Sequence, residues 1–123
     1  MPLREPAIIA VVDNEASVRK ALLRLFRAAG LKARAFASGP EFLATLPSCG
    51  YSCLVLDLHM PGLTGFDVQK ECMFADVRLP TIIITAHDEP GTRQKCLSAG
   101  AKAYFCKPFD DSELLEAIEE AVK

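Results

Sequence analysis

The sequence predicts an α/β fold with three layers, in which a parallel five-stranded sheet carries helices on both faces. Five short apolar runs alternate with five segments that show helical features. Strands that alternate with helices in this way pair in parallel and are joined by right-handed crossovers. No linker, repeat or low-complexity tract interrupts the alternation. We therefore expect residues 1–123 to form a single domain, with a core from about residue 7 to residue 122.

The expected strands are apolar runs shorter than a typical helix. They lie around Ile8–Val12, Ala33–Ala37, Cys53–Leu56, Thr81–Ile84 and Ala103–Phe105. Runs that are apolar throughout are typical of strands buried on both faces of a parallel sheet.

The expected helices carry apolar stripes or terminal signals. The first, Ala16–Ala29, has an apolar stripe at helical spacing and stops at Gly30, a common C-terminal signal. The last, Asp111–Val122, opens with acidic residues, which suit a helix N-terminus. The other three are expected at Glu41–Leu46, Gly65–Phe74 and Thr92–Ala99.

Composition and charge narrow the class of protein. No apolar run approaches the ~20 residues that span a bilayer, and residues 1–6 are too short and polar for a signal peptide. The formal net charge of −2 offers no general attraction to nucleic acid. We therefore expect a cytoplasmic protein in which this domain binds neither membrane nor nucleic acid.

Charge is distributed unevenly along the chain. Basic residues gather in the first third, and acidic residues gather in the last expected helix. This pattern indicates either two solvated helix faces or two complementary surfaces for partners, and both interpretations stay open.

The five cysteines do not have the spacing of a metal or redox site. Their number is odd and no C-x-x-C pair occurs. Cys53 and Cys106 lie inside expected strands, where we expect inert core thiols. The others are Cys49, Cys72 and Cys96.

Four of the expected strands end in side chains that suit phosphoryl transfer. Asp13 follows the first strand, Asp57 the third, Thr85 the fourth and Lys107 the fifth. In open parallel sheets, ligands bind outside the carboxyl ends of the strands. Two acids, a hydroxyl and an ammonium in this order predict a phosphoryl-accepting site.

Asp57 is the candidate nucleophile, because a carboxylate can accept a phosphoryl group as an acyl phosphate. Taken alone, an aspartate at a strand end could equally cap the following turn. Phosphoryl transfer normally uses Mg²⁺, which takes oxygen ligands. Asp13 and Asp57 offer carboxylates, His59 a backbone carbonyl and Asn14 an amide oxygen. Taken alone, Asp13 would be interpreted as an ordinary helix N-cap.

Thr85 and Lys107 are the candidate phosphate ligands. The Thr85 hydroxyl can donate a hydrogen bond to a phosphate oxygen, although β propensity alone would also explain a threonine there. The Lys107 ammonium is a point charge suited to phosphate. Lys107 precedes Pro108, and a cis peptide bond there could aim the ammonium into the site.

From about Ile8 to Val122, the chain resembles the receiver domains of bacterial response regulators. The resemblance is carried by four motifs: Val12–Glu15, Leu56–Gly65, Thr85–Ala86 and Lys107–Phe109. Within that family the chain is most similar to the FixJ/NarL-type receivers, as Ser17–Leu22 and Ser98–Phe109 indicate.

The resemblance implies a flavodoxin-like (βα)₅ fold with strand order 2-1-3-4-5. It implies that Asp57 takes a phosphoryl group from the phosphohistidine of a histidine kinase or phosphotransfer protein, with Mg²⁺. Ala86 then belongs to the phosphate-binding set, and Thr85 and Tyr104 form a switch pair in which the tyrosine ring turns inward. The face of the fourth helix, fifth strand and fifth helix then changes its partners. From the sequence alone, without the resemblance, Tyr104 would be interpreted as a half-buried aromatic that packs in the core.

The resemblance also implies a switch and not an enzyme, with at most self-phosphorylation and self-dephosphorylation. The output would be a regulated process such as transcription, through an attached or partner domain. A homodimer through the last helices is a further expectation.

Asn14 departs from the family pattern, which has two adjacent acids after the first strand. The loss of a charged ligand predicts weaker Mg²⁺ binding. The loss of a like charge beside Asp57 predicts less electrostatic strain and a more active-like resting state. Asn14 also leaves open a pseudo-receiver, which would act as a constitutive protein-interaction module.

His59 and His87, the only histidines, each lie two residues after a site residue, Asp57 and Thr85 respectively. In the family, side chains at these positions border the phosphoryl group. We therefore expect both to tune the phosphate lifetime, by sterics, by positioning water or as a general base. The alternative is two solvent-facing loop histidines.

Two other classes of protein fit less well. An aspartyl-phosphate hydrolase would use Asp13 and Glu15, and would leave Asp57 without a role. A flavodoxin-type cofactor binder needs a phosphate-cradling loop after the first strand, where the acids here would repel phosphate.

Overall fold

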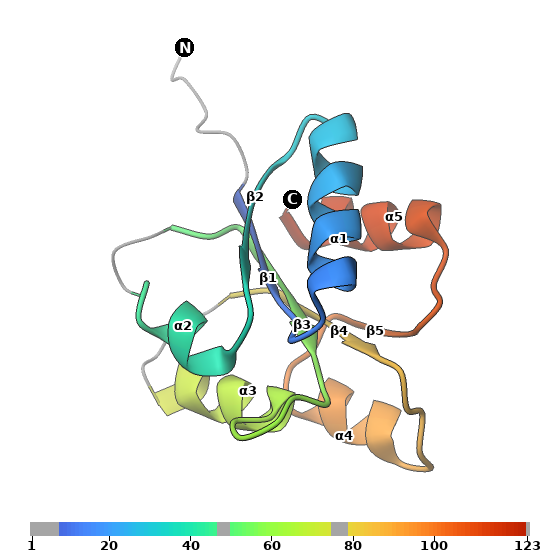
Figure 1. Ribbon diagram of the computed structural model, residues 1–123. Helices are drawn as coiled ribbons and strands as arrows, with labels where there is room; N and C mark the ends of the chain where they lie inside the picture. The colour runs from blue at the N-terminus through green and yellow to red at the C-terminus, as the bar shows by residue number, and fades with distance from the viewer. Residues whose placement is uncertain (1–7, 47–49, 75–78, 123) are drawn as a thin grey trace.

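The computed structural model describes residues 8–46, 50–74 and 79–122, and it contains five parallel strands in one sheet (Figure 1). The order is β2-β1-β3-β4-β5, which confirms the fold class and strand order expected above. The strands are β1 (Ile8–Val12), β2 (Lys32–Phe36), β3 (Cys53–Asp57), β4 (Thr81–Thr85) and β5 (Ala103–Cys106).

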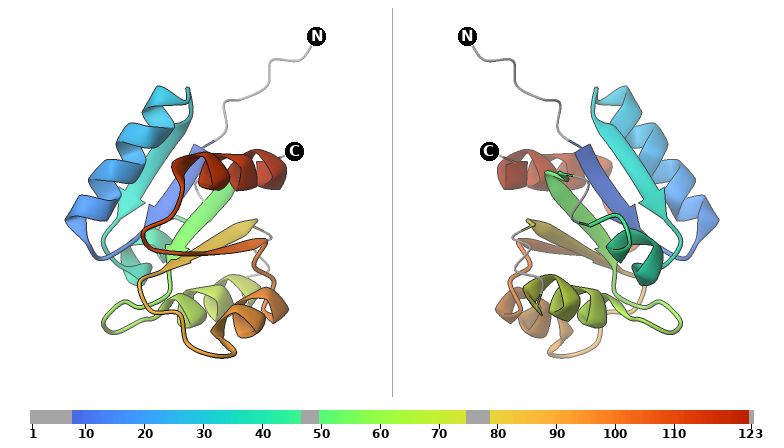
Figure 2. Two further views of the ribbon diagram at one scale, coloured as in Figure 1. Left: turned by 90° about the vertical axis from the view of Figure 1, so that its right-hand side faces the viewer. Right: turned by 90° about the vertical axis from the view of Figure 1, so that its left-hand side faces the viewer.

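Helices cover both faces of the sheet, and Figure 2 shows the three layers. The helices are α1 (Ala16–Ala28), α2 (Gly39–Leu43), α3 (Gly65–Phe74), α4 (Thr92–Ser98) and α5 (Asp111–Val122). One buried cluster joins the sheet to α1 and α5, and a second joins it to α2, α3 and α4. Among the residues that the structure describes, no helix combines the length and apolar character needed to cross a membrane.

The central strands are buried on both faces because their side chains alternate between the two clusters. In β3, Cys53 and Val55 face α1 and α5, while Leu54 and Leu56 face the other three helices. All five residues of β3, and all five of β4, are buried. The buried strands β3 and β4 therefore position their last residues, Asp57 and Thr85, at the carboxyl edge of the sheet.

Several element boundaries differ from the sequence prediction. The largest difference is in α2, expected at Glu41–Leu46 and observed at Gly39–Leu43. The Ser38 hydroxyl accepts a hydrogen bond from the Glu41 N–H at 3.3 Å, and Pro40 lies in the first turn. A capping serine followed by proline starts a helix, so α2 begins two residues earlier than expected.

β3 and β4 each extend one residue beyond the apolar run that predicted them, to Asp57 and Thr85. The reason is pairing, since Asp57 lies opposite Ile84 and Thr85 opposite Cys106 in the ladders. Smaller shifts occur in α1, β2 and α4.

The expectation that Cys106 is a core thiol was wrong. Cys53 is buried, as expected, but Cys106 is exposed because it ends the edge strand β5. Burial raises the pKa of the Cys53 thiol to about 12, which makes it inert. Cys49 lies outside the described residues.

Gly65 lets the chain after β3 pass close to the start of α3. A Cβ atom at this position would lie 2.8 Å from the carbonyl oxygen of Asp57 and 2.8 Å from Cα of Leu58. Both are backbone atoms, which cannot move aside as a flexible side chain can. The absence of a side chain at Gly65 therefore sets the path of the loop that follows Asp57.

Candidate functional site

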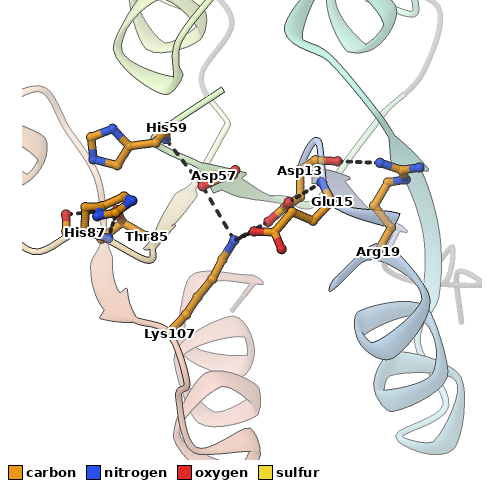
Figure 3. Close-up of polar contacts among 8 residues, drawn as sticks. All are labelled: Asp13, Glu15, Arg19, Asp57, His59, Thr85, His87 and Lys107. Carbon is orange, nitrogen blue, oxygen red and sulfur yellow. Dashed lines mark hydrogen bonds and ion pairs between the residues drawn. The ribbon is translucent and has the colours of Figure 1, made fainter. Parts of the chain in front are cut away.

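The carboxyl ends of β1, β3, β4 and β5 bring together the four side chains that the sequence placed at strand ends (Figure 3). Asp57 is the last residue of β3, and Thr85 the last of β4. Asp13 and Lys107 directly follow β1 and β5. Parallel pairing puts all four at one edge of the sheet, because every strand runs in the same direction.

Lys107 links the acidic residues of the site. Its Nζ lies 2.9 Å from Asp13 Oδ2, 3.4 Å from Glu15 Oε1 and 3.7 Å from Asp57 Oδ1. The side chains of Asp13 and Asp57 are 0% and 3% exposed, so both carboxylates lie out of bulk water. The peptide bond between Lys107 and Pro108 is cis.

Burial raises the pKa of Asp57 to about 6, and the negative charge of Asp13 adds to this effect. The ammonium of Lys107 and the backbone N–H of His59 act in the opposite direction. Burial also lowers the pKa of Lys107, but its hydrogen bond to Asp13 and the surrounding carboxylates outweigh this and raise the pKa overall. Lys107 is therefore a permanent positive charge beside a carboxylate that is costly to ionise.

Asp13 is held in place through three groups. Its Oδ1 accepts a hydrogen bond from the Glu15 N–H at 2.8 Å, and its carbonyl oxygen accepts one from Arg19 Nη1 at 2.8 Å. Its own N–H donates to the Phe36 carbonyl at 3.1 Å. The carboxylate therefore points at Lys107 with little freedom to turn away.

The donor set fits a magnesium ion but supplies few charges. Asp13 and Asp57 place two carboxylates around the same ammonium, and oxygen ligands are what Mg²⁺ prefers. Asn14 is exposed in the turn between β1 and α1. In the described part of the chain, no three or more histidine, cysteine, aspartate or glutamate side chains are grouped to hold a metal ion.

The hydroxyl of Thr85 is engaged by its own loop. Thr85 is fully buried, and its Oγ1 donates to the His87 carbonyl at 3.1 Å and accepts from the His87 N–H at 3.1 Å. Ala86, between them, is exposed. Donation from Thr85 to a phosphate oxygen would thus require release of the His87 carbonyl.

The ring of Tyr104 lies inside the protein. The residue is 5% exposed and belongs to the buried cluster on the α4 side of the sheet. Its hydroxyl donates a hydrogen bond to Asp88 Oδ1 at 2.9 Å, and the Arg93 guanidinium lies 5.9 Å from the ring centre. Burial, then Asp88, raises the pKa of Tyr104, so the hydroxyl stays protonated as a donor.

The two histidines meet on the Thr85 side of Asp57 (Figure 3). Their ring centres are 5.3 Å apart and the ring planes meet at 88°. Both residues are exposed, and the His59 N–H donates to Asp57 Oδ1 at 3.4 Å. The structure therefore brings together two side chains that are 28 positions apart in the sequence.

Three residues of the site were not assigned a part in it by the sequence prediction. Glu15 contacts Lys107, Arg19 holds the carbonyl of Asp13, and Asp88 holds Tyr104. The only sequence signals for these contacts are the acid Asp88 shortly after Thr85 and the basic Arg19 in the first turns of α1. Both signals are weak.

The family model for the response regulator receiver domain matches residues 9–119. The chain belongs to this family. Its members are phospho-acceptor switches of two-component systems that typically use Mg²⁺ and interact with histidine kinases or phosphotransfer proteins. The receiver resemblance and the FixJ-like relatives expected from the sequence are thus confirmed.

Curated relatives include nodulation protein W of Bradyrhizobium diazoefficiens, 41% identical over 118 residues, which cover 95% of this chain and 52% of the relative. The transcriptional regulatory protein FixJ of the same organism is 32% identical over 94% of this chain and 56% of the relative. This receiver domain therefore spans about half the length of the curated relatives it matches.

Solved structures agree with the assignment. The FixJ-N crystal structure has a TM-score of 0.89 and 31% identity, covering 97% of this chain and 95% of that chain. A receiver protein from Burkholderia phymatum has a TM-score of 0.84 and 41% identity, covering 94% of both chains.

Proposed function

We propose that this receiver domain accepts a phosphoryl group on Asp57 from the phosphohistidine of a kinase or phosphotransfer protein. The observation that carries the proposal is the position of Lys107, whose ammonium lies 2.9 Å from the Asp13 carboxylate and 3.7 Å from that of Asp57. A buried nucleophile with a fixed cation beside it suits attack on phosphorus, since the cation stabilises developing negative charge.

In the proposed transfer, an Asp57 carboxylate oxygen forms a bond to phosphorus. The bond from phosphorus to the donor's imidazole nitrogen breaks, and its electron pair stays on that nitrogen. Lys107 would stabilise the phosphoryl oxygens, while Asp13 keeps Lys107 in place. Asp13, Asp57 and the His59 carbonyl would hold Mg²⁺, with Asn14 contributing less, and the ion would neutralise charge on the phosphoryl oxygens.

A cleft of about 500 Å³ beside the site suits the phosphodonor protein. Its apolar wall comes from α1 and from the segment after β5, through Val18, Leu22, Leu25, Pro108 and Phe109. Glu15 and Lys107 line both the cleft and the acidic site, so a helix that docks here would carry its phosphohistidine next to Asp57. We assign the cleft to that donor.

The switch would run through Thr85 and Tyr104. A phosphoryl group brings roughly −1.5 to −2 charge and strong acceptor oxygens, taking phosphorylated hydroxyl residues as a guide. These oxygens would attract the Thr85 hydroxyl and break its hydrogen bond to the His87 carbonyl. The loop after β4 would then move, and with it Asp88, which accepts the hydrogen bond from Tyr104. The surface of α4, β5 and α5 would then change its partners, with homodimerisation one result and regulation of transcription the output.

His59 and His87 would set the lifetime of the phosphorylated state. Both imidazoles lie on one side of Asp57, where they can hinder or orient an attacking water (Figure 3). Decay of the phosphorylated protein should change in His59→Ala and in His87→Ala, and wild-type lifetimes in both variants would contradict this role.

The test of the function is the intact mass after incubation with a small phosphoryl donor, with and without Mg²⁺. We expect a single added phosphoryl group that requires both Mg²⁺ and Asp57, so the Asp57→Ala variant stays unmodified. An unmodified wild type at high Mg²⁺ would overturn the proposal and favour the pseudo-receiver that Asn14 leaves open.

A further inference from the structure

His59 and His87 form a pair of imidazoles whose ring spacing matches that of a chelate. Two imidazoles bound to one tetrahedral ion, with metal–nitrogen distances of about 2.0–2.1 Å, have ring centres roughly 5 Å apart. The observed separation is 5.3 Å, and the ring planes are nearly perpendicular at 88°. Both side chains are exposed and can rotate, so one nitrogen of each ring can turn toward a shared ion.

The ring nitrogens are available for such a ligand. In the described part of the chain, the hydrogen bonds of both residues involve only their backbone groups. Both side chains are exposed, so an ion can reach them without opening the core. The edge-to-face contact between two exposed rings does not by itself account for their pairing.

The backbone on both sides of the pair is fixed in advance. Thr85 Oγ1 bonds both the N–H and the carbonyl of His87 at 3.1 Å, and the His59 N–H bonds Asp57 Oδ1 at 3.4 Å. Preorganised ligands lose less conformational entropy on binding than ligands on a free loop. The backbone positions of both candidate ligands are therefore set before an ion binds.

The charge of the surrounding loop favours a cation. Asp88 and Glu89 directly follow His87, and both are exposed. The segment of residues 86–91 carries these two acids and no lysine or arginine. A local excess of negative charge raises the concentration of cations near the imidazoles.

We propose that His59 and His87 together bind a divalent transition-metal ion that prefers nitrogen ligands, with Zn²⁺ as the test ion and water in the remaining coordination positions. Imidazole suits zinc, copper and nickel, whereas Mg²⁺ takes oxygen ligands. The site is thus chemically distinct from the carboxylates of Asp13 and Asp57. It does not depend on the proposed phosphorylation, although an ion held there would stand beside Asp57.

The experiment titrates the metal-free receiver domain with Zn²⁺ in competition with a chromophoric chelator, in buffer that contains millimolar Mg²⁺. We expect one Zn²⁺ per chain, and an affinity at least tenfold weaker in His59→Ala and in His87→Ala. Cys106→Ser is the matched control, because Cys106 is an exposed soft ligand outside the pair. Asp57→Asn is the second control, because it removes the charge of the acidic site and keeps an Oδ1 that can accept the His59 N–H.

Both controls should keep the wild-type affinity. Equal Zn²⁺ affinity in the wild type and the histidine variants would overturn the proposal. Loss of binding in Cys106→Ser or in Asp57→Asn would also overturn it, because the ion would then be held elsewhere.

A spectroscopic measurement tests the ligand set directly. With one equivalent of Cu²⁺, electron paramagnetic resonance should show hyperfine coupling to two imidazole nitrogens in the wild type and to one in each single variant. Coupling to a single nitrogen in the wild type would show that the pair does not chelate.

Discussion

The hydroxyl of Tyr104 donates a hydrogen bond to Asp88 Oδ1 at 2.9 Å, while its ring stays within the core. This bond ties β5 to the loop between β4 and α4, the same loop that carries His87 and follows Thr85. The ring thus already has the inward position that the family resemblance assigns to the switched state. Thr85, by contrast, still donates to the His87 carbonyl, so only the tyrosine of the expected switch pair has the inward arrangement.

Tyr104→Phe removes only the hydroxyl and should lower the free energy of unfolding by about 1–2 kcal/mol, because one hydrogen bond to a charged acceptor is lost. Asp88→Asn should cost a similar or smaller amount. Urea unfolding followed by circular dichroism measures both. In the double variant the two losses should not add, since they remove one interaction. Fully additive losses would show that the bond contributes nothing.

Asp57→Asn should stabilise the protein at neutral pH. Burial and Asp13 raise the pKa of Asp57 from 3.8 to about 6, so the folded state holds its proton more tightly than the unfolded chain does. Wild-type stability is therefore full below about pH 4 and falls as pH rises through about 6. Above that range the variant should be more stable by up to about 3 kcal/mol, with no difference below about pH 4.

Urea unfolding at pH values from below about 4 to above about 6, in the presence of a chelator, measures the effect of Asp57→Asn. Asp67→Asn is the matched control of opposite sign. Hydrogen bonds from the backbone and side chain of Thr64 lower the pKa of Asp67, so its ionised form favours folding. Asp67→Asn should therefore be less stable than the wild type at neutral pH, and approach it as pH falls. A pH-independent gain for Asp57→Asn would contradict the assigned cause.

Asn14→Asp should tighten Mg²⁺ binding by about tenfold, because one carboxylate is added to a site with two. Isothermal titration with Mg²⁺ measures the change. Asn14→Ala should bind no more tightly than the wild type, which separates the added charge from loss of the amide. Unchanged affinity in Asn14→Asp would place residue 14 away from the metal.

Gly65→Ala should destabilise the protein by about 1–3 kcal/mol, the usual cost of overpacking. The added methyl group would meet the backbone of Asp57 and Leu58, so the loop after β3 must shift. Gly50→Ala is the control, because its Cβ meets nothing within 4 Å. Thermal unfolding should show a lower melting temperature for Gly65→Ala than for Gly50→Ala. Equal melting temperatures would contradict the close contact between Gly65 and the backbone of Asp57 and Leu58.

The fold could be predicted because its signals are local. Apolar runs and helical stripes report which faces are buried, and the family motifs supply the strand order. The boundaries of α2 could not be predicted in the same way, because the cap formed by Ser38 and Pro40 outweighs the helical pattern that follows. Cys106 was misplaced because an apolar run does not distinguish the edge strand β5 from a central one.

The sequence by itself determined the type and order of the elements, and that Asp13, Asp57, Thr85 and Lys107 stand at strand ends. Only the tertiary structure decided which of these groups touch. Lys107 contacts Asp13 across 94 positions, Tyr104 finds Asp88, and His59 meets His87. Such contacts depend on strand order and on the paths of loops between strands. Spacing along the chain reports the periodicity of one element, whereas a meeting of two loops is set by the packing of the whole sheet.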